Sequence, residues 1–116
     1  MRATGPFDRA DRILFPREYR HVRQCGRRAA SASFVLWVAE GSKGRRLGIS
    51  VSKKVGNAVV RNRVKRAIRE WFRASRGEMR DSIDLVVSAR HGAGDLRALE
   101  VATMLDEIAA KGGCQR

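Results

Sequence analysis

The chain has 116 residues, of which 43% are hydrophobic and 32% are charged. This length and composition favour one folded domain and argue against both a two-domain protein and a disordered chain. Lys and Arg total 25 against 12 Asp and Glu, which gives a formal net charge of +13. A surplus of this size favours a polyanionic partner, so we expect nucleic acid first and an anionic membrane surface second.

Membrane insertion and a disulfide-based fold are both disfavoured. The longest apolar run, residues 34–39, is far shorter than the roughly 20 residues that span a bilayer, and the chain does not open on a signal-peptide pattern. Two cysteines, Cys25 and Cys114, do not make a disulfide framework. We therefore expect a cytoplasmic protein.

The first 26 residues predict an arm followed by a short helix. Residues 1–14 are poorly patterned, and we expect a loose arm in which Ile13 and Leu14 dock on the core. Pro16 suits a first helical turn and Gly26 suits a stop, so residues 16–24 are predicted to be helical.

Residues 33–52 predict a β-hairpin. "SFVLWVAE" is rich in β-branched and aromatic residues, and the two glycines of "GSKG" at 41–44 separate it from "RRLGISVSKK". In the second strand, apolar residues alternate with Gly48, Ser50 and Ser52. The first strand has a second apolar row, Val35, Trp37 and Ala39, which must be covered or used.

The stretch after Gly56 predicts a long helix from about Ala58 to Ser75, with Asn57 as its cap. At about 100° per residue, its apolar positions fall in one arc and a row of basic residues follows on the adjoining face. The apolar positions are Val60, Val64, Ala67, Ile68 and Trp71, and the basic row is Arg61, Lys65, Arg69 and Arg73. One side should pack, and the other should present a cationic ridge.

The remaining elements are a buried strand at 83–90, a loop at 91–94 and a final helix capped by Asp95 and ending near Ala110. The pattern thus gives the order α, β, β, α, β, α in a single domain. Residues 1–11 and 112–116 are expected to be flexible.

The sequence offers no evident catalytic or metal-binding group. It has no HExxH, no CxxC, no Walker glycine loop and no GxSxG, and its only histidines are His21 and His91. His21 and Cys25 stand four residues apart, but two ligands without a third do not make a metal site.

Two interpretations of the basic helix remain open. A charge run is usually a solvated face in which acids and bases alternate, but only Glu70 interrupts the basic residues from Arg61 to Arg73. A polyanion would offset that repulsion, and arginine suits phosphate. Tyr19 and Trp37 are either a stacking platform for unpaired bases or ordinary core residues.

The stretch "LGISVSKKVGNAVVRNRVKRAIREWFR", residues 47–73, resembles the protein subunit of bacterial ribonuclease P. The Ser-x-Ser-Lys-Lys strand end, the Gly-Asn turn and the Arg-Asn-Arg helix carry the resemblance, which extends over roughly residues 12–110. It implies an α+β fold, a small α/β sandwich shared with some ribosomal-protein domains, with the order α-β-β-β-α-β-α. It also implies a left-handed βαβ crossover and a four-stranded sheet, with the added strand near residues 28–33.

The resemblance implies that the RNA subunit, with Mg²⁺ bound mainly by that RNA and the substrate, removes the 5′ leader of precursor tRNA. The protein would then bind ribonuclease P RNA and the leader, with neither DNA nor membrane as a partner. The main alternative is a basic ribosomal or RNA-scaffolding protein without a role in cleavage, and a lesser one is a stand-alone nuclease.

Residue by residue, the resemblance implies two sets of contacts. The RNA-subunit contacts would be Lys53, Lys54, Arg61, Asn62, Arg63, Lys65, Arg66 and Arg69. The cleft for the leader would contain Tyr19, Arg23, Val35 and Trp37. Arg23 stands where the family often has an aromatic residue, which suggests a phosphate contact in place of stacking.

Overall fold

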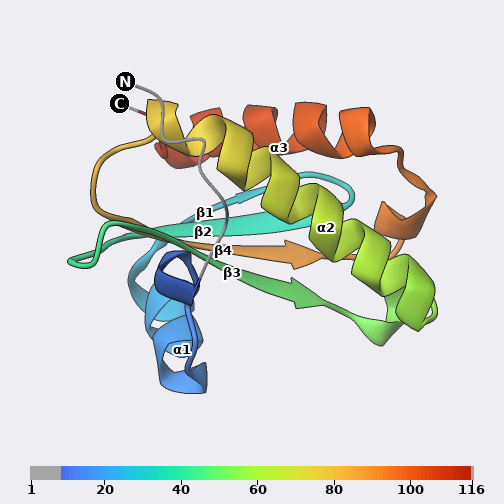
Figure 1. Cartoon of the computed structure of the whole chain (residues 1–116), viewed down its shortest axis with the longest axis horizontal. Coiled ribbons are helices and arrows are strands. Elements are labelled where there is room, and N and C mark those ends of the chain that lie inside the picture. Colours follow the sequence, from blue (N-terminus) through green and yellow to red (C-terminus); the bar gives the residue numbers. More distant parts are fainter. Residues whose placement is uncertain (1–8, 116) are drawn as a thin grey trace.

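The structure, a computed structural model, describes residues 9–115 (Figure 1). In this part of the chain it has three α-helices and four β-strands, besides short 3-10 turns. They are α1 (Pro16–Cys25), β1 (Arg27–Ala30), β2 (Phe34–Glu40), β3 (Arg45–Val51), α2 (Ala58–Ser75), β4 (Ile83–Ala89) and α3 (Ala98–Gly112). This is the predicted α+β order, including the extra strand that the resemblance implied. That strand lies at β1, slightly earlier than expected, because residues 31–33 form the turn into β2.

The sheet has the order β1-β2-β4-β3, so the predicted hairpin between residues 33–40 and 45–52 is wrong. β4 is antiparallel to β2 and parallel to β3, and it separates the two. Ile83, Leu85 and Val87 are buried on one face of β4, and Asp84 and Val86 are buried on the other. A strand that is buried on both faces is best accommodated at the centre of a sheet. The "GSKG" turn therefore connects two strands, β2 and β3, that are separated in the sheet by β4.

The helix α2 connects the parallel neighbours β3 and β4 and forms the crossover unit. Its bounds, Ala58–Ser75, agree with the prediction, and Asn57 Oδ1 accepts a 3.0 Å hydrogen bond from the Val60 N–H as the expected cap. The crossover helix therefore begins at the residue that the sequence predicts.

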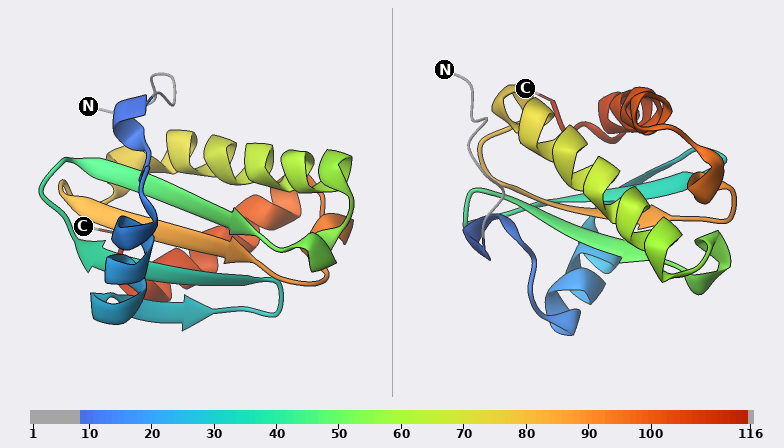
Figure 2. Two further views of the ribbon diagram at one scale, coloured as in Figure 1. Left: turned by 90° about the horizontal axis from the view of Figure 1, so that it is seen from below. Right: turned by 45° about the vertical axis from the view of Figure 1, so that its right-hand side comes forward.

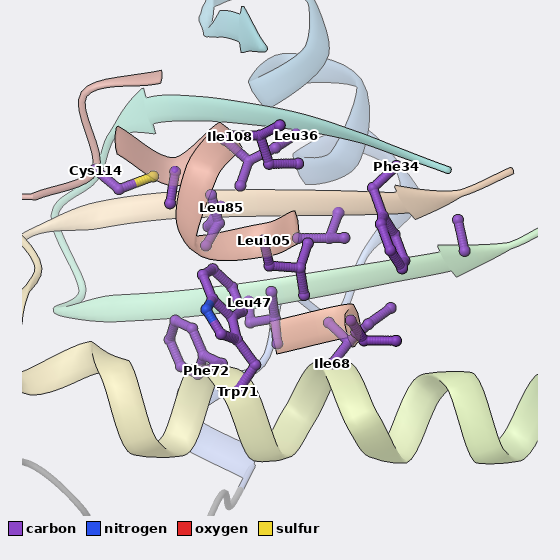
Figure 3. Close-up of a cluster of buried hydrophobic side chains, with 14 of the residues drawn as sticks. Phe34, Leu36, Leu47, Ile68, Trp71, Phe72, Leu85, Leu105, Ile108 and Cys114 are labelled. Carbon is purple, nitrogen blue, oxygen red and sulfur yellow. The ribbon is translucent and has the colours of Figure 1, made fainter. Parts of the chain in front are cut away.

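The main core lies between the sheet and the α2–α3 layer (Figure 3). Phe34 and Leu36 from β2 meet Phe72 from α2 and Leu105 from α3, all with no exposed surface. At its edge, Trp71 Nε1 donates a 2.8 Å hydrogen bond to Asp106 of α3. The apolar arc of α2 therefore faces the sheet, as predicted.

Within residues 9–115, the opposite face of the sheet is covered by α1 and the short segment that precedes it (Figure 1). Val22 of α1 and Ile13 of the preceding segment pack on Ala39 and Val86, and the Ile13 N–H donates to the Leu47 carbonyl at 3.0 Å. The second apolar row of β2 is thus covered in part by α1. Leu14, the other residue expected to dock, is 42% exposed.

The start of α3 differs from the prediction. Asp95 does not cap it, because residues 93–95 form a separate 3-10 turn and the cap residue is Arg97. The Arg97 N–H donates at 2.9 Å to Glu100, which stands at the right helical position to accept it. The helix ends at Gly112, two residues later than expected, and Gly113 closes it with a left-handed φ of 79°.

The sequence predicts flexible chain ends. Residues 1–8 and 116 lie outside the described part, and residues 9–11 form a 3-10 turn. At the other end, Gly112 and Cys114 are buried, and burial raises the pKa of the Cys114 thiol to about 12. Residues 112–114 are therefore part of the packed domain.

Candidate nucleic-acid interface

A buried ion network, which we call the clasp (Glu18, Arg46 and Asp84), fixes α1 against the sheet. Arg46 of β3 donates two 2.9 Å hydrogen bonds to Asp84 of β4 and one of 3.1 Å to Glu18. Glu18 also accepts the backbone N–H groups of Leu14 and Phe15. Burial raises the pKa of Glu18, but the hydrogen bonds from Arg46 and the backbone outweigh it, so the pKa lies below its ordinary value.

The clasp lets α1 hold two predicted leader-binding residues over the sheet. Tyr19 lies against Gly48 of β3, where a Cβ would come within 2.7 Å of Tyr19 Cε1. The Arg23 guanidinium lies over the Trp37 ring, 5.2 Å from its centroid, which is a cation–π distance. Both aromatic rings are half-buried. The structure thus brings Tyr19, Arg23 and Trp37 to one face.

The neighbouring row of the sheet has small side chains and lies outside the cover of α1. Figure 2 shows α1 crossing the sheet, and no α-helix of the described part of the chain covers the carboxyl ends of β3 and β4 on that side. In register across the four strands, this row is Ala30, Val35, Ser88 and Ser50. Val35 is only 4% exposed, so the partly exposed residues beside it offer most of the surface. The stacking surface is defined as Tyr19, Arg23, Trp37 and this row.

The basic residues of α2 lie on two flanks, and the predicted ridge is one of them. Lys65 and Arg69 face the α1 side, where they line a small groove of about 140 Å³ together with Tyr19. Arg63 and Arg66 face the opposite side, toward the start of α3. The buried arc of α2 separates the flanks, because residues two apart on a helix point in different directions.

The predicted RNA-contact residues keep their charges free of acidic partners. Within residues 9–115, no ion pair involves Lys53, Lys54, Arg61, Arg63, Lys65, Arg66 or Arg69. Lys53, Lys54 and Asn62 are exposed, and in the described part Arg61 Nε is buried without a hydrogen-bond partner. Arg73, the last residue of the predicted ridge, is instead 2.6 Å from Glu70.

Sequence reasoning missed part of this interface. Ser88 was not singled out, because its place beside Ser50 depends on β4 lying next to β3. Arg28 lies opposite Trp37 in the β1–β2 register and adds an exposed cation beside that ring. The alternation at Gly48, Ser50 and Ser52 was the available signal for a face of small residues.

Known proteins of one family resemble this chain in sequence and fold. Residues 7–112 match the sequence profile of the family described as Ribonuclease P. The chain is 45% identical to the ribonuclease P protein component of Shouchella clausii over 102 residues, covering 86% of this chain and 84% of that protein. For the same component of Dictyoglomus thermophilum, the identity is 39% over 110 residues, 92% of each chain.

Two solved structures agree with this result. The RNase P protein from Staphylococcus aureus superposes with a TM-score of 0.81 at 32% identity and covers 97% of both chains. The RNase P protein from Thermotoga maritima gives a TM-score of 0.77 at 27% identity, over 86% of this chain and 96% of that one. No helix within residues 9–115 is long and apolar enough to cross a membrane.

Proposed function

The chain belongs to the ribonuclease P protein family, and we propose that it is the protein subunit that binds ribonuclease P RNA and the 5′ leader of precursor tRNA. In this role it assists endonucleolytic removal of the leader, while the RNA subunit performs the hydrolysis. The observation that carries the proposal is the small groove where Lys65 and Arg69 of α2 meet Tyr19 of α1. At this groove, the cationic flank of α2 adjoins the aromatic ring of Tyr19.

The α2 residues suit contact with the RNA subunit. Arg61, Lys65 and Arg69 recur at four-residue intervals on one flank, and their charges have no acidic partner in residues 9–115. Their mutual repulsion is offset when each cation meets a phosphate and condensed counterions are released. Guanidinium groups also donate in pairs to phosphate oxygens. We therefore assign α2 and the preceding Lys53 and Lys54 to the RNA subunit.

The stacking surface suits an unpaired leader. Tyr19 and Trp37 offer half-buried rings on which bases stack without regard to sequence, and the floor of small residues lets a strand lie close to the sheet. Arg23 already covers Trp37, so it either stacks with a base or turns to a phosphate. Its position therefore suits contact with either a base or a phosphate of the leader.

We assign catalysis to the RNA subunit because the family resemblance implies it. Within residues 9–115, no group of three or more His, Cys, Asp or Glu is placed to hold a metal ion. His21 Nδ1 and Cys25 Sγ lie 3.7 Å apart at the surface and lack a third ligand among the described residues. We propose that Mg²⁺ is held mainly by the RNA and substrate, and that the complex acts in the cytoplasm without DNA as a partner.

Reconstitution tests this proposal. Cleavage of precursor tRNA should be measured at physiological Mg²⁺ with ribonuclease P RNA alone, with the protein alone, and with both. We expect little cleavage by either component and strong stimulation by the pair. Cleavage by the protein alone would make it a nuclease. RNA binding without any stimulation would favour a ribosomal or scaffolding protein, and either result would contradict the proposal.

A further inference from the structure

A second, larger groove lies on the flank of α2 that faces away from the stacking surface. Its volume of about 690 Å³ falls in the usual range of small-ligand sites. The walls are α2, the turn at residues 93–97 and the first turn of α3. In Figure 2, α2 and the start of α3 lie side by side at this end of the molecule. The predicted RNA-subunit contacts include Arg63 and Arg66 at the edge of this groove, but they assign no ligand to the groove itself.

The wall formed by residues 93–95 is fixed in place by two close contacts. Arg63 donates a hydrogen bond from Nη2 to the Gly94 carbonyl. A Cβ at Gly94 would lie 2.6 Å from the Val55 carbonyl oxygen, so the turn packs as close to the residues before α2 as glycine permits. The groove is therefore formed before any ligand arrives, and a ligand does not have to order a loop.

The interior of the groove is apolar and built from small side chains. Val64 and Val101 close the bottom and are almost fully buried. Ala67 and Leu96 are partly exposed along the walls, and Ala98 is exposed at the mouth. Such a lining accepts a flat apolar surface without steric conflict.

The rim of the groove is positively charged. Its charged residues are Arg63, Arg66, Arg97, Glu70 and Asp95. Glu70 is already neutralised by Arg73, whose Nη2 lies 2.6 Å from Glu70 Oε1. Two arginines, Arg66 and Arg97, are exposed on opposite sides of the mouth. A ligand that combines an apolar face with an anionic group matches both parts of the groove.

We propose that this groove binds one unpaired nucleotide of ribonuclease P RNA, with its base on the apolar lining and its phosphate between Arg66 and Arg97. The inference rests on the proposed function, because it needs the RNA subunit as partner. A base fits better than an acidic peptide, since a flat ring fills a slot lined with small side chains and guanidinium planes stack on bases. The groove also continues the surface of α2 that we assign to the same RNA.

A filling substitution tests the base pocket without removing charge. Ala98→Phe should block the mouth, whereas Ala110→Phe adds the same ring to an exposed position on the last turns of α3. We expect Ala98→Phe to weaken binding of ribonuclease P RNA about tenfold. The log-log salt slope should stay the same, because no phosphate contact is lost. Base-specific chemical probing should show one unpaired nucleotide that the wild type and Ala110→Phe protect and that Ala98→Phe leaves reactive.

A second pair of variants tests the phosphate contact. Arg97→Ala should lower the salt slope by about 0.7 to 0.9. The Arg97 side chain does not cap α3, so the helix should remain intact. Lys111→Ala, which removes an exposed cation from the far end of α3, should leave the slope unchanged. Thermal melting of all four variants shows whether they are folded.

The outcomes separate this proposal from the function on which it rests. If the wild type stimulates cleavage but Ala98→Phe binds and protects the RNA as the wild type does, the groove holds no nucleotide and only the present proposal fails. Unchanged binding and slope in Arg97→Ala would also overturn it. If the wild type neither binds the RNA nor stimulates cleavage, both proposals fail.

Discussion

The two faces of the sheet are closed in different ways. On one face, α2 and α3 cover apolar side chains of all four strands, and the resulting core has almost no exposed surface. On the other face, a single ten-residue helix is fixed by the clasp and a small apolar cluster, and a row of small residues stays partly open. The first face stabilises the domain, and the second leaves room for a ligand.

The difference shows why a polar attachment is useful on a binding face. Hydrophobic closure of the α1 side would need a longer helix over Ser50 and Ser88, and the surface for unpaired bases would be lost. A charged cluster instead orients α1 through three directional hydrogen bonds from one guanidinium. Substitutions on the two sides should therefore affect different properties.

The largest expected effect is on the α2–α3 side. Phe72→Ala removes a fully buried ring from the main core, and we expect the free energy of unfolding to fall by about 3 to 5 kcal/mol. Val22→Ala, beneath α1, removes two methyl groups and should cost about half as much. Denaturant unfolding measures both, and a loss below about 1 kcal/mol for Phe72→Ala would contradict its place in the main core.

The clasp should come next. Arg46→Met leaves Asp84 and Glu18 without their cation, and we expect a loss of about 3 kcal/mol in the free energy of unfolding. Glu40→Gln removes an exposed ion pair with Arg80 and serves as the matched control, with a loss below about 1 kcal/mol. If the two variants unfold at the same denaturant concentration, the clasp does not hold α1.

The pH dependence of stability sharpens the same point. Because the folded state lowers the pKa of Glu18 from 4.5, the Glu18 contacts stabilise the protein above that pH, and this contribution is lost as the pH falls through the folded-state pKa. The advantage of the wild type over Glu18→Gln should be largest near neutral pH and should shrink below pH 4.5. A difference in the free energy of unfolding that stays constant over that pH range would show that the ionisation of Glu18 is not coupled to folding.

On the flank of α2, charge removal should affect RNA binding and leave stability nearly unchanged. Replacing both Arg61 and Arg69 by Ala should reduce the log-log salt slope for ribonuclease P RNA by about 1.4 to 1.8, since each lost phosphate contact counts for 0.7 to 0.9. Titrations at several salt concentrations measure this slope. An unchanged slope would mean that the flank faces solvent in the complex.

The smallest expected effect is on the stacking surface. Trp37→Ala should weaken binding of precursor tRNA to the reconstituted complex by on the order of 1 kcal/mol, because one base loses its stacking partner. Mature tRNA without a leader should bind the variant and the wild type equally. A loss that is the same for both substrates would assign Trp37 to the fold and not to the leader.

Local signals in the sequence identified most of the elements. The cap at Asn57 and the apolar arc through Val64 and Ile68 predicted α2 with its observed bounds. The hairpin was wrong because strand pairing is decided by the whole sheet: β4 is buried on both faces and takes a central position. Asp95 was a reasonable cap, but tight packing of Gly94 bends the chain into a separate turn first.

The candidate site was less accessible to sequence reasoning. The contact sets came from the family resemblance, and the structure adds their arrangement. The division of Arg61 and Arg63 between two flanks follows from helix geometry, but the partners of each flank depend on the tertiary fold. In the clasp, Arg46 is 28 positions from Glu18 and 38 positions from Asp84 in the sequence, and no local pattern reveals such contacts.

The division of roles between α1 and α2 can be tested by site-directed cleavage. Cys25→Ser removes the exposed thiol, and Cys114 is buried with a pKa of about 12, so a tethered Fe–EDTA probe would attach only to an introduced cysteine. Gln24→Cys places the probe on α1, and Val59→Cys places it on α2, where the side chain is 76% exposed. We predict cuts in the leader of precursor tRNA from position 24 and cuts in ribonuclease P RNA from position 59. Leader cuts from position 59 and none from position 24 would contradict the account.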